Sequence, residues 1–340
     1  MSDPSWLALA RGSAPLIVSM PHTGNEIPDE FALRFISTWL ARKDTDWWIE
    51  RLYDFAGDRG ATVLRTTISR SVIDVNRDPA GRSLYPGQAT TELCPTTSFD
   101  GEKLYHDGLE PDEQAIARRR EQFFEPYHAT LKAEIARLRE THPKIVLFEA
   151  HSIRSNIPRL FEGELPNFNL GTNSGASCAA GLTEAIERAC DDGAQTSPLH
   201  FPPPRAERAG EVPAPRSARS AAGGSTPRAE GESNALAPSG PSGHLPRTSC
   251  GGGNESGGGM ELTRVTNGRF GGGYTTRHYG DPARGVHAVQ LELAMRGYMD
   301  EPQSPSPDNW PSPYDPARAA PLREILQRIL ETCLTFASQP

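Results

Sequence analysis

Two histidines stand where apolar segments of the sequence end. His22 follows the apolar run in "PLIVSMPHTG", and His151 follows the run in "KIVLFEAHSI". Neutral imidazole is a frequent metal ligand, so the two rings are candidates for one shared metal site. The simpler alternative is that each histidine is a hydrogen-bonded loop residue.

A metal site needs a third ligand, and several carboxylates compete for this role. Asp46 falls in the first turn of a helix predicted for residues 45–58 and would complete three protein ligands with one open position, as in catalytic zinc sites. Zinc there would polarise water and a substrate carbonyl together, which amide hydrolysis at neutral pH requires. Asp46 also has a structural explanation, because the helix dipole stabilises a carboxylate near a helix N-terminus. Other carboxylates that could be the third ligand are Asp44, Glu26 and Glu149.

One glutamate lies in otherwise apolar company and is a candidate proton carrier. Glu292 belongs to "VQLELA", which is predicted to be a strand. If its side chain faces the cleft, apolar surroundings favour the protonated carboxyl enough for proton exchange near neutral pH. We therefore expect Glu292 to act as general base and acid.

A polar loop, "SRSVIDVNRDPAG", concentrates groups that bind anions. Arg70, Asn76 and Arg77 place two guanidinium groups and an amide on it. Guanidinium groups match carboxylates in a bidentate way, so the loop predicts an anionic substrate. The structural alternative is that Arg70 or Arg77 pairs with Asp74 or Asp78.

The elements that would position these groups alternate along the chain. Apolar runs predict strands at 15–20, 61–70, 144–153 and 286–294. Periodic patterns predict helices at 29–41, 45–58, 111–142 (interrupted at Pro126), 175–190 and 316–336. This order predicts an α/β fold with a mostly parallel mixed sheet and helices on both faces. Ligands bind at the carboxyl edge of such sheets, where both histidines are expected.

Composition sets the domain organisation and excludes several partners. The chain has 340 residues, enough for a single catalytic domain over 1–340, interrupted by a Pro/Gly/Ser-rich insertion at about 192–259 that is predicted to be disordered. The net charge of −8 argues against nucleic acid. Five scattered cysteines and the lack of a long apolar run indicate a cytoplasmic protein with no membrane segment.

Six ordered blocks carry a resemblance to the N-formylglutamate amidohydrolase (N-formylglutamate deformylase) family. They are "SMPHTGNEIP", "DTDWWIERLYDFA", "SRSVIDVNRDPAG", "FEAHSIRSNIPRLFEGELPNFNLGT", "NGRFGGGYTTRHYGDP" and "HAVQLELAMRGYMDE". The resemblance covers nearly everything outside 192–259.

The resemblance implies a zinc carboxypeptidase-like (phosphorylase/hydrolase-like) fold. It also implies hydrolysis of N-formyl-L-glutamate to formate and L-glutamate, in histidine degradation. The implied residues are His22, Asp46 and His151 for Zn²⁺ or another divalent metal, Glu292 for acid/base catalysis, and Arg70, Asn76, Arg77 and Arg277 for substrate carboxylates. Trp48, Glu164 and Gly271 depart from the family pattern, where histidine, arginine and lysine are common.

Two other functions stay open. The chain could be a related zinc hydrolase of another N-acyl amino acid or of a peptide C-terminus. It could also be a metal-binding relative without activity, impaired by the insertion.

Overall fold

The computed structural model describes residues 4–83, 87–196 and 262–339. These residues belong to a compact unit formed by the chain on either side of the insertion. Residues 197–259 of the predicted insertion lie outside the described residues. The first residues of the predicted insertion, 192–196, are described and form the end of helix α5 (Ala180–Thr196).

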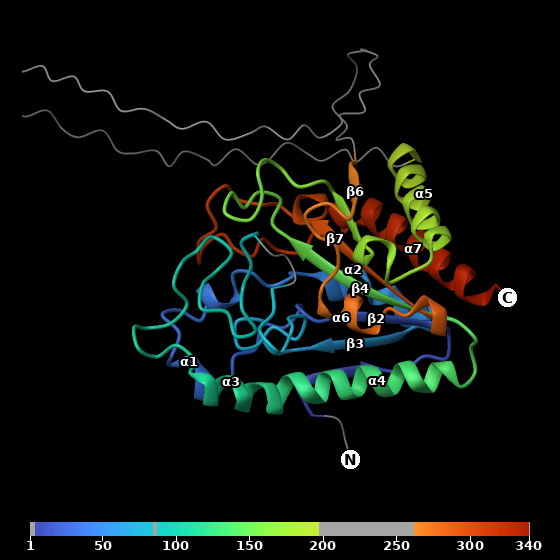
Figure 1. Ribbon diagram of the computed structural model, residues 1–340. Coiled ribbons are helices and arrows are strands. Elements are labelled where there is room, and N and C mark those ends of the chain that lie inside the picture. Colours follow the sequence, from blue (N-terminus) through green and yellow to red (C-terminus); the bar gives the residue numbers. More distant parts are fainter. Residues whose placement is uncertain (1–3, 84–86, 197–261, 340) are drawn as a thin grey trace, which may run out of the picture. The chain divides into compact units, whose positions relative to one another are not determined.

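The centre of the fold is a seven-stranded mixed sheet in the order β1-β3-β2-β4-β7-β5-β6 (Figure 1). Its strands are β1 (Leu7–Ala10), β2 (Leu16–Met20), β3 (Thr62–Thr66), β4 (Ile145–Ile153), β5 (Phe168–Gly171), β6 (Arg264–Thr266) and β7 (Val286–Ala294). The β1–β3 and β5–β7 pairs are antiparallel, and the other four pairs are parallel. The predicted α/β fold with a mostly parallel mixed sheet is confirmed. The short strands β1, β5 and β6 were not predicted.

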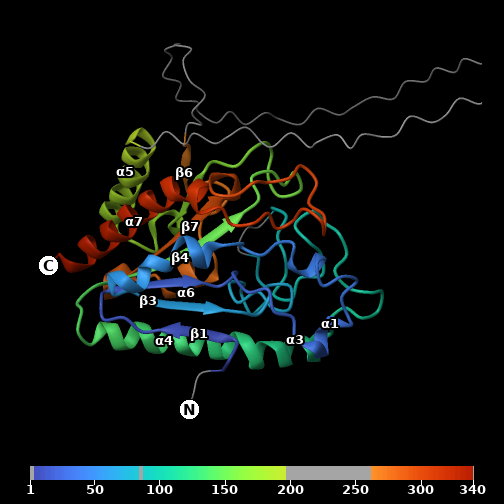
Figure 2. The same ribbon diagram turned by 180° about the vertical axis from the view of Figure 1, so that it is seen from behind.

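Side chains alternate along the central strands and build two separate cores. On β4, Val146, Phe148 and Ala150 pack into the core that contains residues of α7 (Pro316–Ser338). Ile145 and Leu147 pack into the core that contains residues of α4 (Glu125–Arg139). Helices therefore cover both faces of the sheet, with α4 along one face and α5 and α7 on the other (Figures 1 and 2).

The described residues form seven α-helices, of which α6 was not predicted and α7 agrees closely with its predicted range. They are α1 (Asp29–Ala32), α2 (Ile49–Leu52), α3 (Glu113–Arg119), α4 (Glu125–Arg139), α5, α6 (Tyr274–Tyr279) and α7 (Pro316–Ser338). The helix predicted for 45–58 is shorter because Trp48 has a left-handed backbone (φ 65°), so α2 begins only at Ile49. Among the described helices, none is long and apolar enough to cross a membrane.

The long helix predicted for 111–142 contains a local change of geometry before its proline. A π-helical turn, Arg120–Phe124, joins α3 to α4. Pro126 follows directly after this turn, as the second residue of α4, and has no N–H to donate to it. The helix predicted for 29–41 is also reduced, to α1 and a 3₁₀ turn at Leu40–Arg42.

Candidate active site

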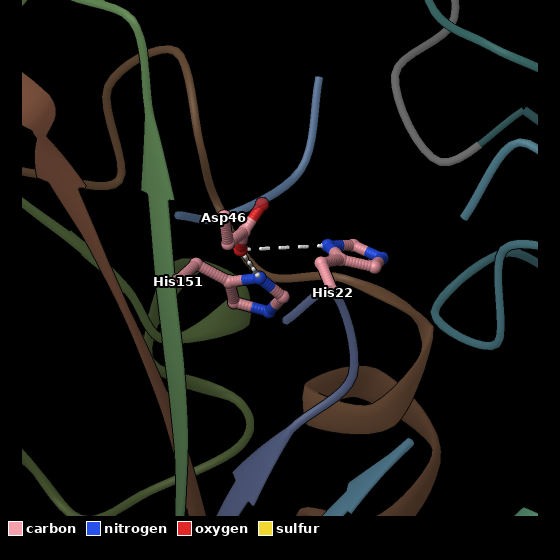
Figure 3. A group of neighbouring side chains, drawn as sticks. All are labelled: His22, Asp46 and His151. Atoms are coloured by element: carbon pink, nitrogen blue, oxygen red, sulfur yellow. Dashed lines mark hydrogen bonds and ion pairs between the residues drawn. The ribbon is translucent and has the colours of Figure 1, made fainter. Parts of the chain in front are cut away.

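The candidate metal ligands come from three separate elements. His22 lies two residues after β2, and Asp46 lies in the turn before α2, where its N–H donates to the carbonyl of His22. His151 lies within β4, which continues to Ile153, so it is not the strand-end residue that the sequence predicts. The three side chains point toward one another (Figure 3).

The three side chains lie close enough to share one ion. His151 Nδ1 is 2.9 Å and His22 Nδ1 is 3.7 Å from Asp46 Oδ2. One donor atom from each buried residue lies within 4.8 Å of the others. Asp46 Oδ1 is also buried and has no hydrogen-bond partner in the described part of the chain. This group could bind a metal ion, and two imidazoles with one carboxylate are a donor set that suits zinc.

A second carboxylate fixes the ring of His22. Asp74 Oδ1 lies 2.6 Å from His22 Nε2, so Nε2 donates its proton and Nδ1 keeps its lone pair toward Asp46. Burial and the nearby Arg70 cation lower the pKa of His22, which favours the neutral ring. Burial alone would raise the pKa of Asp74, but His22 and Arg70 beside it lower that pKa well below its usual range. Carboxylates behind metal-binding histidines orient the ring and increase its basicity.

His151 lies between two carboxylates. Its Nδ1 faces Asp46, and its Nε2 lies 3.5 Å from Glu149 Oε1 and 3.2 Å from Asn76 Nδ2. Burial alone would lower the pKa of His151, but the carboxylates of Asp46 and Glu149 raise it to about 10. Without a cation, this ring therefore favours a protonated form, and a metal ion must displace a proton to bind it.

The other carboxylates that the sequence offered as ligands have different partners. Asp44 Oδ2 accepts from the N–H of Phe99 at 2.6 Å, and its Oδ1 lies 3.4 Å from Arg154. Glu26 accepts from Thr67 Oγ1 near the surface. Asp46 lies two residues before Trp48, the N-cap of α2, so it is near this helix end without capping it.

Glu292 lies beside the metal-site group. It is the register partner of His151 in the β4–β7 pair and is 7% exposed. Burial, with a smaller contribution from the negative charge of Asp46, raises the pKa of Glu292 to about 7. Gln290 Nε2 donates to Glu292 Oε2 at 3.3 Å. A carboxyl with this pKa can both accept and return a proton near neutral pH.

A cavity joins these groups. His22, His151 and Glu292 form one part of its lining. Three arginines line it as well: Arg70, Arg77 and Arg269. Its apolar wall consists of Phe99, Ile153, Leu160 and Phe270. The cavity therefore combines cationic and apolar surfaces next to a site that could bind a metal ion.

The two arginines of the polar loop line the cavity and also lie beside Asp74. Arg70 lines the cavity, and its Nη2 also donates to Asp74 Oδ2 at 2.7 Å. Arg77 Nη2 donates to Thr91 Oγ1 at 3.2 Å, and its Nε lies 3.6 Å from Asp74 Oδ2. Both guanidinium groups are thus held by the protein and exposed to the cavity.

The segment that begins α6 holds several site residues in place. The N–H of Gly273 donates to Gln290 Oε1 at 2.7 Å, and the N–H of Thr275 donates to Asn76 Oδ1 at 2.9 Å. Asn76 lines the cavity, yet its amide oxygen and nitrogen both face protein groups. Arg277 is not among the lining residues, and its Nε donates to the carbonyl of Gly272. Its role as a carboxylate contact stays a prediction.

Gln290 and Arg269 are among the cavity residues that the sequence did not predict. Gln290 was detectable, because it lies two positions before Glu292 on a strand and therefore on the same face. Arg269 lies in the quoted "NGRF" block, but nothing in its spacing points to the cavity. It donates to the carbonyls of Leu160 and Ala89 and to Gln88 Oε1, so it ties two loops to its own segment.

The departures from the family pattern lie outside the cavity lining. Glu164 is exposed and lies 3.5 Å from Arg296, so it does not face the candidate substrate site. Trp48 Nε1 donates to the carbonyl of Ser312. A Cβ added at Gly271 would lie 3.8 Å from Nη2 of Arg277.

Comparisons with known proteins agree with this geometry. The model of the N-formylglutamate amidohydrolase family matches residues 14–198 and 254–299. The chain is 37% identical to an N-formylglutamate deformylase of Pseudomonas putida, over 98% of this chain and 97% of the relative. It is 36% identical, with the same coverage, to a protein of that name from Pseudomonas aeruginosa.

Two solved structures share the fold. A crystal structure of N-formylglutamate amidohydrolase from Ralstonia eutropha matches with a TM-score of 0.63 at 17% identity, over 98% of each chain. A gene product of Agrobacterium tumefaciens matches with a TM-score of 0.57 at 14% identity, over 99% of this chain and 97% of that one. The family match and the two curated relatives together show that this chain belongs to the N-formylglutamate amidohydrolase family.

Proposed function

We propose that this protein is a zinc-dependent hydrolase that releases formate from N-formyl-L-glutamate and leaves L-glutamate, a reaction of histidine degradation. The observation that carries the proposal is the convergence of His22, Asp46 and His151 beside Glu292 in an arginine-lined cavity. The names of the curated relatives support the substrate. A zinc carboxypeptidase-like fold, as the resemblance implies, is part of the proposal.

The residues present fit a divalent metal ion. His22 and His151 would supply their Nδ1 atoms and Asp46 a carboxylate oxygen, because these atoms face one another. Asp46 Oδ1 accepts no hydrogen bond within the described residues, although Arg70 Nη1 lies 3.6 Å from it, so it could accept a further ligand. When bound, zinc would act as a Lewis acid on the formyl oxygen and on the attacking water.

The remaining steps belong to side chains of this protein. Glu292 takes a proton from the water that attacks the formyl carbon, and it then protonates the nitrogen as the carbon–nitrogen bond breaks. Water thereby supplies the new oxygen of formate, and the amine leaves as glutamate. Arg70 and Arg77 bind the carboxylates of the glutamate portion through charge-assisted hydrogen bonds.

The decisive experiment combines metal analysis with formate release. Purified full-length protein is expected to contain zinc and to release formate from N-formyl-L-glutamate. Chelation is expected to abolish release, and added Zn²⁺ is expected to restore it. Zinc-loaded protein that releases no formate would reject the proposed reaction.

A panel of substrates tests the related hydrolases. The panel varies the acyl group and the side chain separately. It contains N-acetyl-glutamate, N-formyl-aspartate, N-formyl-leucine and a short peptide ending in glutamate. The arginine-lined cavity predicts a preference for acidic side chains. Faster hydrolysis of N-formyl-leucine would contradict the assigned substrate class and leave the metal chemistry in place.

A further inference from the structure

A buried carboxylate that is not a proposed ligand lies directly behind one of the ligands. Glu149 precedes His151 by two residues on β4, so both side chains leave the sheet on the same face. Glu149 is 1% exposed, and within the described residues its Oε1 has no hydrogen-bond partner. That oxygen lies 3.5 Å from His151 Nε2. A buried carboxylate with an unused oxygen is costly unless a donor approaches it.

The other oxygen of Glu149 is fixed by the neighbouring helix. Thr276 Oγ1 on α6 donates to Glu149 Oε2 at 2.6 Å, and Thr276 is fully buried. This hydrogen bond holds the carboxylate so that Oε1 faces the imidazole. Glu149 therefore has one oxygen committed to α6 and one directed at His151.

His151 Nε2 faces one further polar group, the amide of Asn76. Asn76 Nδ2 lies 3.2 Å from Nε2, while its Oδ1 accepts from the N–H of Thr275. The amide consequently presents its NH₂ group, a donor, to the ring. Asn76 can donate to Nε2 only while that atom is unprotonated, so a proton on Nε2 leaves Glu149 as the acceptor beside it.

We propose that Glu149 is a positioning residue for metal binding. When Nδ1 of His151 serves as the ligand atom, Nε2 carries a proton and donates a hydrogen bond to Glu149. Thr276 holds the Glu149 carboxylate in position for this hydrogen bond. The proposal rests on the metal site of the proposed function. His22 has the same arrangement, because its Nε2 donates to Asp74 while its Nδ1 faces Asp46. Each imidazole would thus have a carboxylate behind it.

The test measures zinc affinity instead of turnover. Glu149→Met removes the acceptor, and Glu149→Gln keeps a weaker, neutral one. The zinc dissociation constant of full-length protein, determined by competition with a chromophoric chelator, is expected to rise about 10- to 100-fold in the Met variant. The Gln variant is expected to lose less. Partial rescue by Gln would not occur if Glu149 only filled space.

Ser19→Ala is the matched control. Ser19 is the register partner of Glu149 on β2, is buried and loses a hydrogen bond to Tyr127 on substitution. Its zinc affinity is expected to equal that of the wild type. Equal weakening in Ser19→Ala and Glu149→Met would indicate a general packing effect and overturn the proposal, as would a wild-type dissociation constant in Glu149→Met.

Thr276→Val decides the matter if Glu149→Met does not fold. It preserves the shape of the side chain, removes the hydrogen bond to Glu149 and is expected to weaken zinc binding by less than Glu149→Met. Unchanged affinity in a folded Thr276→Val protein would overturn the proposal. A protein that shows this series but releases no formate would reject the proposed reaction alone, whereas a wild type that binds no zinc would overturn both.

Discussion

His151 and Glu292 stand side by side on neighbouring parallel strands, as register partners in the β4–β7 pair, and both line the same cavity. This pairing brings a proposed metal ligand and the proposed proton carrier together through strand register. Two rigid strands of the sheet, which hold their side chains more firmly than loops do, thus fix the relative position of the two groups.

Replacing Glu292 with Gln is expected to lower kcat by about 10²- to 10⁴-fold while zinc content stays near normal, because the proton carrier is lost and the ligands remain. Formate release and metal analysis on the same preparation check this. Glu301→Gln is the control, since Glu301 is a partly buried carboxyl that accepts from the N–H of Ser155 outside the substrate cavity. Retained turnover in Glu292→Gln would reject Glu292 as the base.

Replacing Asp46 with Asn is expected to reduce zinc content to a small fraction of that of the wild type. The substitution removes the charge that faces both imidazoles. Asp44→Asn serves as the control, because Asp44 lies two residues away but contacts Phe99 and Arg154. Equal metal loss in both variants would contradict the choice of Asp46 as the third ligand.

Replacing Arg77 with Met is expected to raise KM for N-formyl-glutamate about 10- to 100-fold and to change kcat much less, because a charge-assisted contact contributes about 1.5–3 kcal/mol. Steady-state kinetics separate the two parameters. Arg82→Met is the control, because Arg82 is an exposed arginine of the same region that pairs with Asp78. An unchanged KM in Arg77→Met would refute the carboxylate contact.

Acid is expected to destabilise the protein through His128. This residue is buried on α4, its Nε2 donates to the carbonyl of Val75, and burial lowers its pKa to about 4. The unfolded chain binds a proton below pH 6.5 and the folded chain only below about 4, so stability falls as pH decreases between these values, by ~3 kcal/mol. His128→Gln cannot titrate and should lose correspondingly less stability in denaturant unfolding at pH 7 and pH 4. An identical loss in both proteins would contradict this assignment.

Replacing Gly273 with Ala is expected to displace the Asn76 amide in the candidate active site. A Cβ there would lie 2.3 Å from Asn76 Nδ2, so the Asn76 amide or α6 must move. Gly273→Ala should lower stability by about 1–3 kcal/mol and reduce activity. Gly181→Ala, on α5, meets nothing within 4 Å and should be neutral or slightly stabilising. Thermal unfolding and kinetics of both variants test this difference.

Much of the fold and site could be predicted because the signals are local. The apolar runs that lead to His22 and His151 are long and rich in branched residues, so the central strands and the convergence of the two rings follow from parallel strand order. Gln290 follows the same alternation as Glu292 and was open to the same reasoning.

The rest depends on contacts between distant segments. The strands β1, β5 and β6 have only three or four residues each and form because a neighbouring strand pairs with them. The helix predicted for 29–41 ends early, and Phe35 instead forms a bridge with Tyr105. Arg269 reaches the cavity through loops at Gln88 and Leu160, which no sequence spacing encodes.

The alternation along β4 constrains how this protein can change in length. Ile145 and Leu147 face α4 and Glu149 and His151 continue on that face, while Phe148 and Ala150 face the opposite core. Deleting one residue before Glu149 would turn the side chains of Glu149 and His151 toward the core near α7. The family match is broken after residue 198 and resumes at 254, yet it runs unbroken through β4 and β7. The break in the match therefore lies outside the two strands that carry His151 and Glu292.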